Sequence, residues 1–113
     1  MGERERILVA DDQEVVHQGL RNVFELDGHE VVADAYSAED VKAIVDSPTD
    51  FSVACVDGKM PNAGDGARAA SYIRAQRPDV KIVSMSVDKQ SFGDVDLPKG
   101  FRARQLLDII KSL

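Results

Sequence analysis

The chain has 113 residues, a length that suits one domain, and 43% of them are hydrophobic, enough to build a core. Its formal net charge of −6 and pI near 4.8 argue against direct binding of nucleic acid, because the phosphate backbone attracts basic surfaces. The single cysteine, Cys55, excludes an internal disulfide. We find neither a run of about 18 apolar residues nor a signal peptide, so we expect a cytoplasmic protein without membrane contact.

The N-terminal part of the chain predicts a short strand followed by an amphipathic helix. Residues 7–10 are apolar and end at the acids Asp11 and Asp12, as in a buried parallel strand. Apolar residues then recur at helical spacing, and we expect Asp12 to cap this helix and Gly28 to end it. The apolar face consists of Val15, Val16, Leu20, Val23 and Phe24.

A second strand and a second helix are predicted next. Residues 29–35 have the composition of a strand. Ser37 and Asp40 then form a capping pattern, with the acid in the third helical position, and the helix should run to about Val45. The turn at residues 47–50 separates this helix from the next strand.

The central strand covers residues 51–57 and ends in a single acid, Asp57. A loop from Gly58 to Gly66 leads to a third helix that ends at residues 78–79, and residues 81–87 predict a fourth strand. Strands that alternate with helices indicate an α/β fold with a parallel sheet and right-handed crossovers. Three residues should face inward from the third helix: Ala67, Ala70 and Ile73.

The alternation fails between Asp88 and Pro98. These eleven residues must supply both a crossover and a fifth strand, whereas a crossover with its helix usually needs about 10–12 residues alone. We therefore expect a short edge strand at residues 95–98 and a preceding helix that is reduced or absent. A closing helix follows with an apolar stripe of Leu106, Leu107, Ile110 and Leu113.

Acids at the ends of two strands predict a site. The carboxyl ends of parallel strands form the ligand-binding edge of an open α/β sheet, so Asp11, Asp12 and Asp57 should share one crevice. Two unit charges about 4 Å apart repel by roughly 4 kcal/mol at an effective dielectric constant near 20. Such a group is stable if it shares protons, binds a cation or lies beside a lysine. The alternative is that each acid caps a separate helix.

These features together resemble the receiver domain of two-component response regulators, the CheY-like proteins. The resemblance covers nearly the whole chain and depends on the order of its motifs. They are Asp11-Asp12 after the first strand, the loop Asp57-Gly58-Lys59-Met60-Pro61 completed by Gly66, Ser86 at the end of the fourth strand, and Lys99 after the fifth. The family implies a flavodoxin-like, doubly wound, five-stranded parallel sheet in the order 2-1-3-4-5.

The resemblance also implies a role for each residue. Asp57 would be the phosphoacceptor, Asp11 and Asp12 would hold Mg²⁺ together with Asp57, and the backbone carbonyl of Lys59 would be a further metal ligand. The hydroxyl of Ser86 and the ammonium of Lys99 would contact the phosphoryl group. The alternatives are an ordinary serine at a strand end and a lysine on the surface.

Two departures from the family pattern stand out. The family usually has Lys-Pro where this chain has Pro98-Lys99-Gly100, and its fourth helix is nearly deleted here. The aromatic switch residue that normally precedes the lysine falls on Asp96. Because the fourth helix, fifth strand and last helix form the family's usual output surface, we expect that surface to be unusual.

We therefore expect residues 1–113 to form a single receiver domain that takes a phosphoryl group from a histidine kinase or histidine phosphotransfer protein. It would hydrolyse the phosphoryl group slowly and signal to an unknown downstream protein. One alternative is a receiver-like interaction module that acts without phosphorylation, and another is a small Mg²⁺-dependent phosphohydrolase that uses Asp57. We also expect Lys59 and Asp88, which flank the site with opposite charges, to meet and slow hydrolysis.

Overall fold

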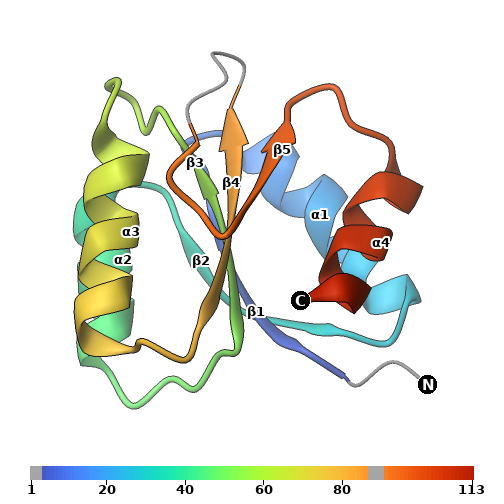
Figure 1. The fold of residues 1–113 in the computed structure, drawn as a ribbon, viewed down its shortest axis with the longest axis horizontal. Helices are drawn as coiled ribbons and strands as arrows, with labels where there is room; N and C mark the ends of the chain where they lie inside the picture. Colours follow the sequence, from blue (N-terminus) through green and yellow to red (C-terminus); the bar gives the residue numbers. More distant parts are fainter. Residues whose placement is uncertain (1–3, 87–90) are drawn as a thin grey trace.

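The computed structural model describes residues 4–86 and 91–113. Within these residues, five parallel strands form one sheet in the order β2-β1-β3-β4-β5, as predicted, and four helices flank it (Figure 1). The strands are β1 (Arg6–Ala10), β2 (Glu30–Ala35), β3 (Val53–Asp57), β4 (Lys81–Ser86) and β5 (Val95–Pro98), and the helices are α1 (Glu14–Leu26), α2 (Ala38–Asp46), α3 (Asp65–Gln76) and α4 (Ala103–Ser112).

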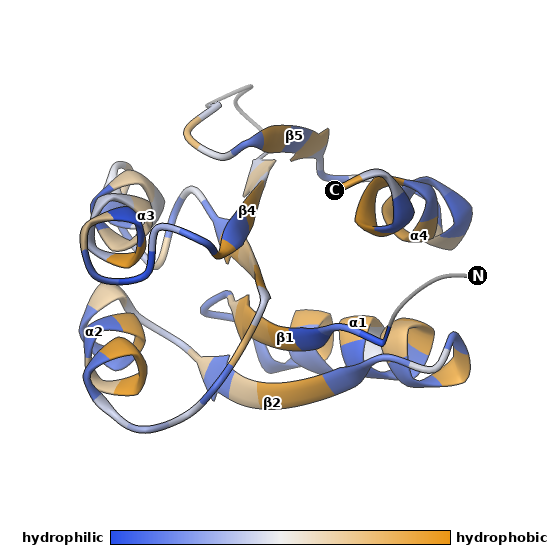
Figure 2. Cartoon of the chain, turned by 60° about the horizontal axis from the view of Figure 1, so that its bottom comes forward, coloured by the Kyte–Doolittle hydropathy of each residue, from blue (hydrophilic) through white to orange (hydrophobic). Residues whose placement is uncertain are grey.

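Helices cover both faces of the sheet, which explains the continuous apolar composition of its central strands. Helices α2 and α3 lie on one face and α1 and α4 on the other, with the hydrophobic strands between them (Figure 2). Every residue of β3 is buried. Because successive side chains of a strand point to opposite faces, Ala54 and Val56 join the core under α2 and α3, while Val53 and Cys55 join the core under α1 and α4.

The start of α1 differs from the prediction, whereas its end agrees with it. Gln13, not Asp12, is the N-terminal flanking residue of this helix, and it makes no side-chain cap. The prediction that Asp12 caps α1 is therefore wrong; instead the carboxylate of Asp11 accepts a hydrogen bond from the Gln13 amide at 2.9 Å. The predicted stop is confirmed, since the chain leaves α1 through Gly28 with a φ of 88°.

The predicted capping pattern of α2 is confirmed at its first bond. The hydroxyl of Ser37 accepts a hydrogen bond from the amide of Asp40. The carboxylate of Asp40 reaches the amide of Tyr36, one residue before the one that a capping box would use.

The inward face of α3 is rotated slightly from the one predicted. Ala70 and Ile73 are buried as expected, but Ala67 is only partly buried and Ala69 takes its place. The reason is that α3 begins with the buried side chain of Asp65, which accepts hydrogen bonds from the amide of Asn62 and from Arg68. Inward positions therefore follow Asp65 at steps of three and four residues.

The connection between β4 and β5 contains no helix in its described part, residues 91–94, in agreement with the predicted reduction of the fourth helix. Asp94 pairs with Ile82 of β4: its amide donates to the Ile82 carbonyl at 2.7 Å, and its carboxylate accepts from the Ile82 amide at 2.8 Å. Arg74 of α3 donates to the carbonyl of Phe92 at 2.7 Å. This segment thus lies along β4.

Helix α4 closes the chain against the sheet face that it shares with α1. Leu106 and Ile110 are buried, and Leu107 and Leu113 pack partly buried against the same core, as the apolar stripe predicted. Within residues 4–86 and 91–113, no helix has both the length and the apolar composition needed to cross a membrane.

Candidate functional site

Asp57 occupies the carboxyl end of the central strand β3. The residue is only 6% exposed, yet its carboxylate has defined polar contacts. One carboxylate oxygen lies 3.5 Å from the amide nitrogen of Lys59, and the other accepts a hydrogen bond from the Lys99 ammonium at 3.2 Å. The strand therefore presents a buried carboxylate at the sheet edge where ligands bind in open α/β folds.

Gly66 allows the loop after β3 to return close to Asp57. Its amide donates to the carbonyl of Gly58 at 3.1 Å. A Cβ atom at position 66 would lie 2.2 Å from the backbone oxygen of Asp57 and 2.7 Å from the Cα of Gly58, which is too close for any side chain. The glycine at this position is therefore required for the packing of the loop against the backbone of Asp57.

Asp11 and Asp12 follow β1 and lie near Asp57 at the same edge of the sheet. Asp11 is fully buried and Asp12 is exposed. One carboxylate oxygen from each of Asp11, Asp12 and Asp57 lies within 4.8 Å of the others, so the structure brings the three predicted acids together. A set of neighbouring carboxylate oxygens, one of them on an exposed residue, is the type of site that hard cations such as Mg²⁺ occupy, usually with several water ligands.

Lys99 supplies the positive charge of the site. Its backbone amide donates to the carbonyl of Ser86 at 3.1 Å, which holds the residue beside the end of β4. Its ammonium donates to Asp11 at 2.9 Å and to Asp57 at 3.2 Å. The order Pro98-Lys99-Gly100 therefore places the lysine against the acids, and Gly100 turns the chain away with a φ of 95°.

Burial and neighbouring charges both affect the pKa values of Asp57 and Lys99. Burial, followed by the neighbouring charge of Asp11, raises the pKa of the Asp57 carboxyl, although Lys99 opposes the change. Burial alone would lower the pKa of Lys99, but its hydrogen bonds and ion pairs with Asp11 and Asp57 outweigh burial and raise the pKa. The lysine is therefore charged at neutral pH and partly neutralises the acids.

The other predicted site residues lie around this centre. Ser86 is buried at the end of β4, where it pairs with Pro98 of β5. Lys59 lies in the loop after Asp57, exposed, and forms an isolated bridge with Ala63. Asp88, the expected partner of Lys59, lies outside the described residues, so the predicted contact between them stays a prediction.

Sequence reasoning missed one buried residue next to the site, His17 of α1. It is 2% exposed, and its ring contacts both the backbone oxygen of Asp11 and the carboxylate of Asp34. A possible signal was its place in the sequence, since a polar residue stands between Val16 and Leu20 on the apolar face of α1. The motifs that predicted the site all lie at strand ends, and a residue in the middle of a helix belongs to none of them.

Comparison with known protein families gives a match over most of the chain. Residues 7–110 match the sequence model of the response regulator receiver domain. The chain belongs to this family. A comparison with curated proteins found no match.

Solved structures of receiver domains share the fold of this family member. A CheY-like response regulator receiver domain protein from Methanospirillum hungatei JF-1 is 24% identical with a TM-score of 0.85, over 97% of this chain and 93% of that one. A response regulator receiver protein from Sinorhizobium medicae WSM419 is 23% identical with a TM-score of 0.80, over 97% and 93%. The Francisella response regulator 1452 receiver domain is 20% identical with a TM-score of 0.80, over 95% and 93%.

Proposed function

We propose that this receiver domain accepts a phosphoryl group on Asp57 from a phosphohistidine of a histidine kinase or histidine phosphotransfer protein, with Mg²⁺ as cofactor. In this proposal residues 1–113 act as a single receiver domain. The observation that carries it is the position of the Asp57 carboxylate, which is buried at the end of β3, hydrogen-bonded to Lys99 and within 4.8 Å of the Asp11 and Asp12 oxygens.

The chemistry follows from the residues that surround Asp57. A carboxylate oxygen of Asp57 attacks phosphorus, a P–O bond forms, and the P–N bond to the donor imidazole breaks with its electron pair leaving on nitrogen. Catalysis of phosphoryl transfer consists largely of positioning and of stabilising the charge on the phosphoryl oxygens. The Lys99 ammonium lies next to the attacking carboxylate and can donate to one of these oxygens, and Ser86 at the end of β4 would offer a hydroxyl.

The acidic residues explain the need for a cation. Asp11, Asp12 and Asp57 would hold Mg²⁺ through their carboxylates, with the Lys59 carbonyl as the further ligand that the family implies. When bound, the cation would lower the repulsion between the anionic phosphoryl group and the carboxylates. Water would later attack the phosphorus of the acyl phosphate, releasing phosphate and restoring the Asp57 carboxylate, after the domain has engaged its downstream protein.

Incubation with Mg²⁺ and acetyl phosphate, followed by intact-protein mass measurement, tests the proposal. We expect the mass of one phosphoryl group to appear on the wild type, to depend on Mg²⁺, and to be absent from the Asp57→Asn variant. Asp79→Asn is the matched control, because Asp79 is an exposed acid just before β4, at the opposite end of that strand from Ser86. Loss of labelling in Asp79→Asn, or labelling of Asp57→Asn, would contradict the assignment.

A phosphorylation-independent interaction module is the second candidate, and one observation favours it. The described part of the β4–β5 connection has no helix, so the output surface usual for the family is altered. Under this alternative the same incubation would give no stable adduct. Rapid turnover of many phosphate esters would instead indicate a phosphohydrolase.

A further inference from the structure

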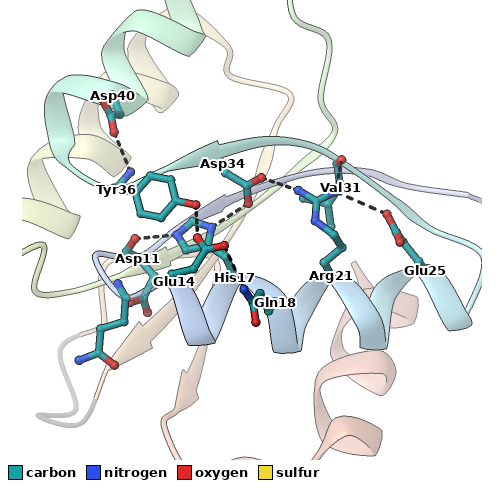
Figure 3. Close-up of polar contacts among 11 residues, drawn as sticks. Asp11, Glu14, His17, Gln18, Arg21, Glu25, Val31, Asp34, Tyr36 and Asp40 are labelled. Carbon is teal, nitrogen blue, oxygen red and sulfur yellow. Dashed lines mark hydrogen bonds and ion pairs between the residues drawn. The ribbon is translucent and has the colours of Figure 1, made fainter.

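His17 lies directly behind the acidic pair, and both of its ring nitrogens face oxygen atoms. Nε2 is 2.7 Å from the backbone oxygen of Asp11, and Nδ1 is 2.7 Å from a carboxylate oxygen of Asp34 in β2 (Figure 3). A backbone carbonyl can only accept a hydrogen bond, so Nε2 carries a proton and donates it to Asp11. His17 thus connects α1, the end of β1 and β2.

The bond from His17 completes the hydrogen bonding of the Asp11 backbone. The amide of Asp11 donates to the carbonyl of Ala35 at 3.0 Å, and its carboxylate accepts from Gln13 and Lys99. The carbonyl that His17 holds belongs to the peptide unit between Asp11 and Asp12. Because this unit is planar, fixing its carbonyl direction also fixes where the Asp12 backbone leaves the strand.

His17 is itself held from two sides. Arg21, one turn further along α1, forms an ion pair with the second carboxylate oxygen of Asp34 and so keeps that carboxylate aimed at Nδ1. Tyr36 stacks on the imidazole with ring centroids 4.1 Å apart and an interplanar angle of 28°. The hydroxyl of Tyr36 donates to Glu14, which fixes the tyrosine over the histidine. The imidazole has little freedom to turn.

We propose that His17 is a positioning residue for the metal site: its Nε2–H holds the Asp11 carbonyl so that the carboxylates of Asp11 and Asp12 converge with that of Asp57. The inference rests on the proposed function, since it concerns the same Mg²⁺ site. His17 does not touch the reacting atoms. Its effect passes through the backbone of Asp11, and partners of this kind typically contribute about 10–100-fold to metal affinity.

Two substitutions separate the two hydrogen bonds of His17. His17→Gln places an amide nitrogen at the position of Nε2 and keeps a donor for the Asp11 carbonyl. His17→Asn places its amide nitrogen at the position of Nδ1, so it keeps the bond to Asp34 and loses the bond to Asp11. Both variants remove the ring from the same buried place. His29→Asn is the matched control, because His29 is also buried, at 7% exposure, and bonds the amide of Glu5 at the other end of β1.

The experiment is a Mg²⁺ titration of the whole chain followed by NMR, with urea unfolding of each variant as the measure of stability. We expect His17→Asn to bind Mg²⁺ about 10-fold more weakly than the wild type, and His17→Gln to stay within about 3-fold of it. His29→Asn should lose stability and keep the wild-type affinity. A role limited to packing would lower the stability of both His17 variants without separating their affinities.

Equal Mg²⁺ affinity in His17→Asn and His17→Gln would overturn the inference, as would equal weakening in His29→Asn. If His17→Asn does not fold, NMR of the wild type provides the test. Addition of Mg²⁺ should shift the Nε2–H resonance of His17 and leave the ring resonances of His29 unchanged. An unshifted His17 resonance would overturn the inference. Wild-type Mg²⁺ binding without the separation of variants refutes the positioning role alone. Absence of Mg²⁺ binding by the wild type refutes the proposed function together with it.

Discussion

Replacing Lys99 with methionine removes the cation between Asp11 and Asp57 while keeping most of the volume of the side chain. The ammonium lies 2.9 Å from an oxygen of Asp11, which is fully buried, and 3.2 Å from an oxygen of Asp57, which is nearly so. Without the ammonium, two buried carboxylates would repel each other with no positive charge between them. We expect the metal-free variant to be substantially less stable than the wild type.

The magnitude follows from the geometry. At an effective dielectric constant near 20, unit charges about 3 Å apart attract by roughly 5–6 kcal/mol, but desolvation of the ions cancels much of this. Removal of one partner of a buried pair typically costs about 3–5 kcal/mol. The side chain of Lys99 is 24% exposed, which places the expected loss at the lower end. We therefore expect a loss of about 3 kcal/mol, or a fall in Tm of roughly 12 °C.

Magnesium should reduce this loss, because it would replace the missing positive charge. A ligand that binds only the folded state adds about 2.7 kcal/mol of stability at 100 times its Kd. The variant should gain more than the wild type, since its site no longer contains a competing cation, and the difference in unfolding free energy should narrow to about 2 kcal/mol or less.

Urea unfolding with EDTA and with saturating Mg²⁺ measures both effects. Lys81→Met is the matched control, because Lys81 is an exposed lysine at the opposite end of β4. We expect this control to lie within about 0.5 kcal/mol of the wild type in both conditions. A Lys99→Met variant as stable as the control in EDTA, or a loss that Mg²⁺ does not change, would refute the electrostatic reasoning.

Three further predictions concern residues of the core and of the site. Burial and the charge of Asp11 raise the pKa of Asp57 above its ordinary value of 3.8, so the ionised carboxylate opposes folding. The wild type should therefore lose stability relative to Asp57→Asn as the pH rises through the raised pKa. The higher Tm of the variant at neutral pH should vanish at a pH low enough to protonate Asp57 in both the folded and the unfolded wild type. Gly66→Ala should lower the free energy of unfolding in urea by about 1–3 kcal/mol and slow the phosphorylation of Asp57 by acetyl phosphate, because the added Cβ would clash with the Asp57 backbone. A variant as stable as the wild type would contradict this close approach of the loop. Burial raises the pKa of the Cys55 thiol to about 12, so a disulfide reagent should label it only on unfolding, and fast labelling of the native protein would show that β3 is exposed.

The elements that could be predicted from sequence are those with a strong local pattern. The apolar run before Asp57 and the apolar residues before Asp11 indicated buried parallel strands, and the carboxyl ends of such strands necessarily share an edge. The short β5 at residues 95–98 was also predictable, since the chain between Asp88 and Pro98 is too short for a helix and a full strand. For these strands, the length of the chain segment and its apolar pattern were enough to predict the structure.

The contacts that escaped prediction depend on side chains from elements that are distant in sequence. The partners of His17 are 6 and 17 residues away, and a histidine on the apolar face of a helix looks like any core residue until β2 supplies Asp34. The boundary error at α1 has a similar cause. Asp12 is a residue type that often caps helices, but the carboxylate of Asp11 accepts the hydrogen bond from the Gln13 amide. The helix therefore begins one residue later than a cap at Asp12 requires.

Polar pairing near β5 explains how the fold tolerates a β4–β5 connection whose described part, residues 91–94, has no helix. Ser84 and Asp96, neighbours on β4 and β5, satisfy each other through a hydrogen bond of 3.0 Å from the serine hydroxyl to the carboxylate. Asp94 pairs with the β4 backbone, and Arg74 of α3 lies 3.8 Å from its other carboxylate oxygen. A helix would normally bury apolar residues at these positions. Here the partly exposed acids keep contact with water, and the buried Ser84 hydroxyl has its hydrogen-bond partner.

The polar composition of this edge of the sheet also affects how phosphorylation of Asp57 would change the structure. By its distance from Lys99, we expect Asp96 to stand where the family usually has an aromatic residue, and its carboxylate accepts a hydrogen bond from Ser84. A ring that exchanges between buried and exposed positions is therefore not available at position 96. Lys99 connects the Asp57 carboxylate to the end of β4, because its ammonium donates to Asp57 and its backbone amide donates a hydrogen bond to the carbonyl of Ser86. Any change at Asp57 that moves the Lys99 ammonium would therefore act first on the junction of β4 and β5, which makes this junction the first place to look for a structural response.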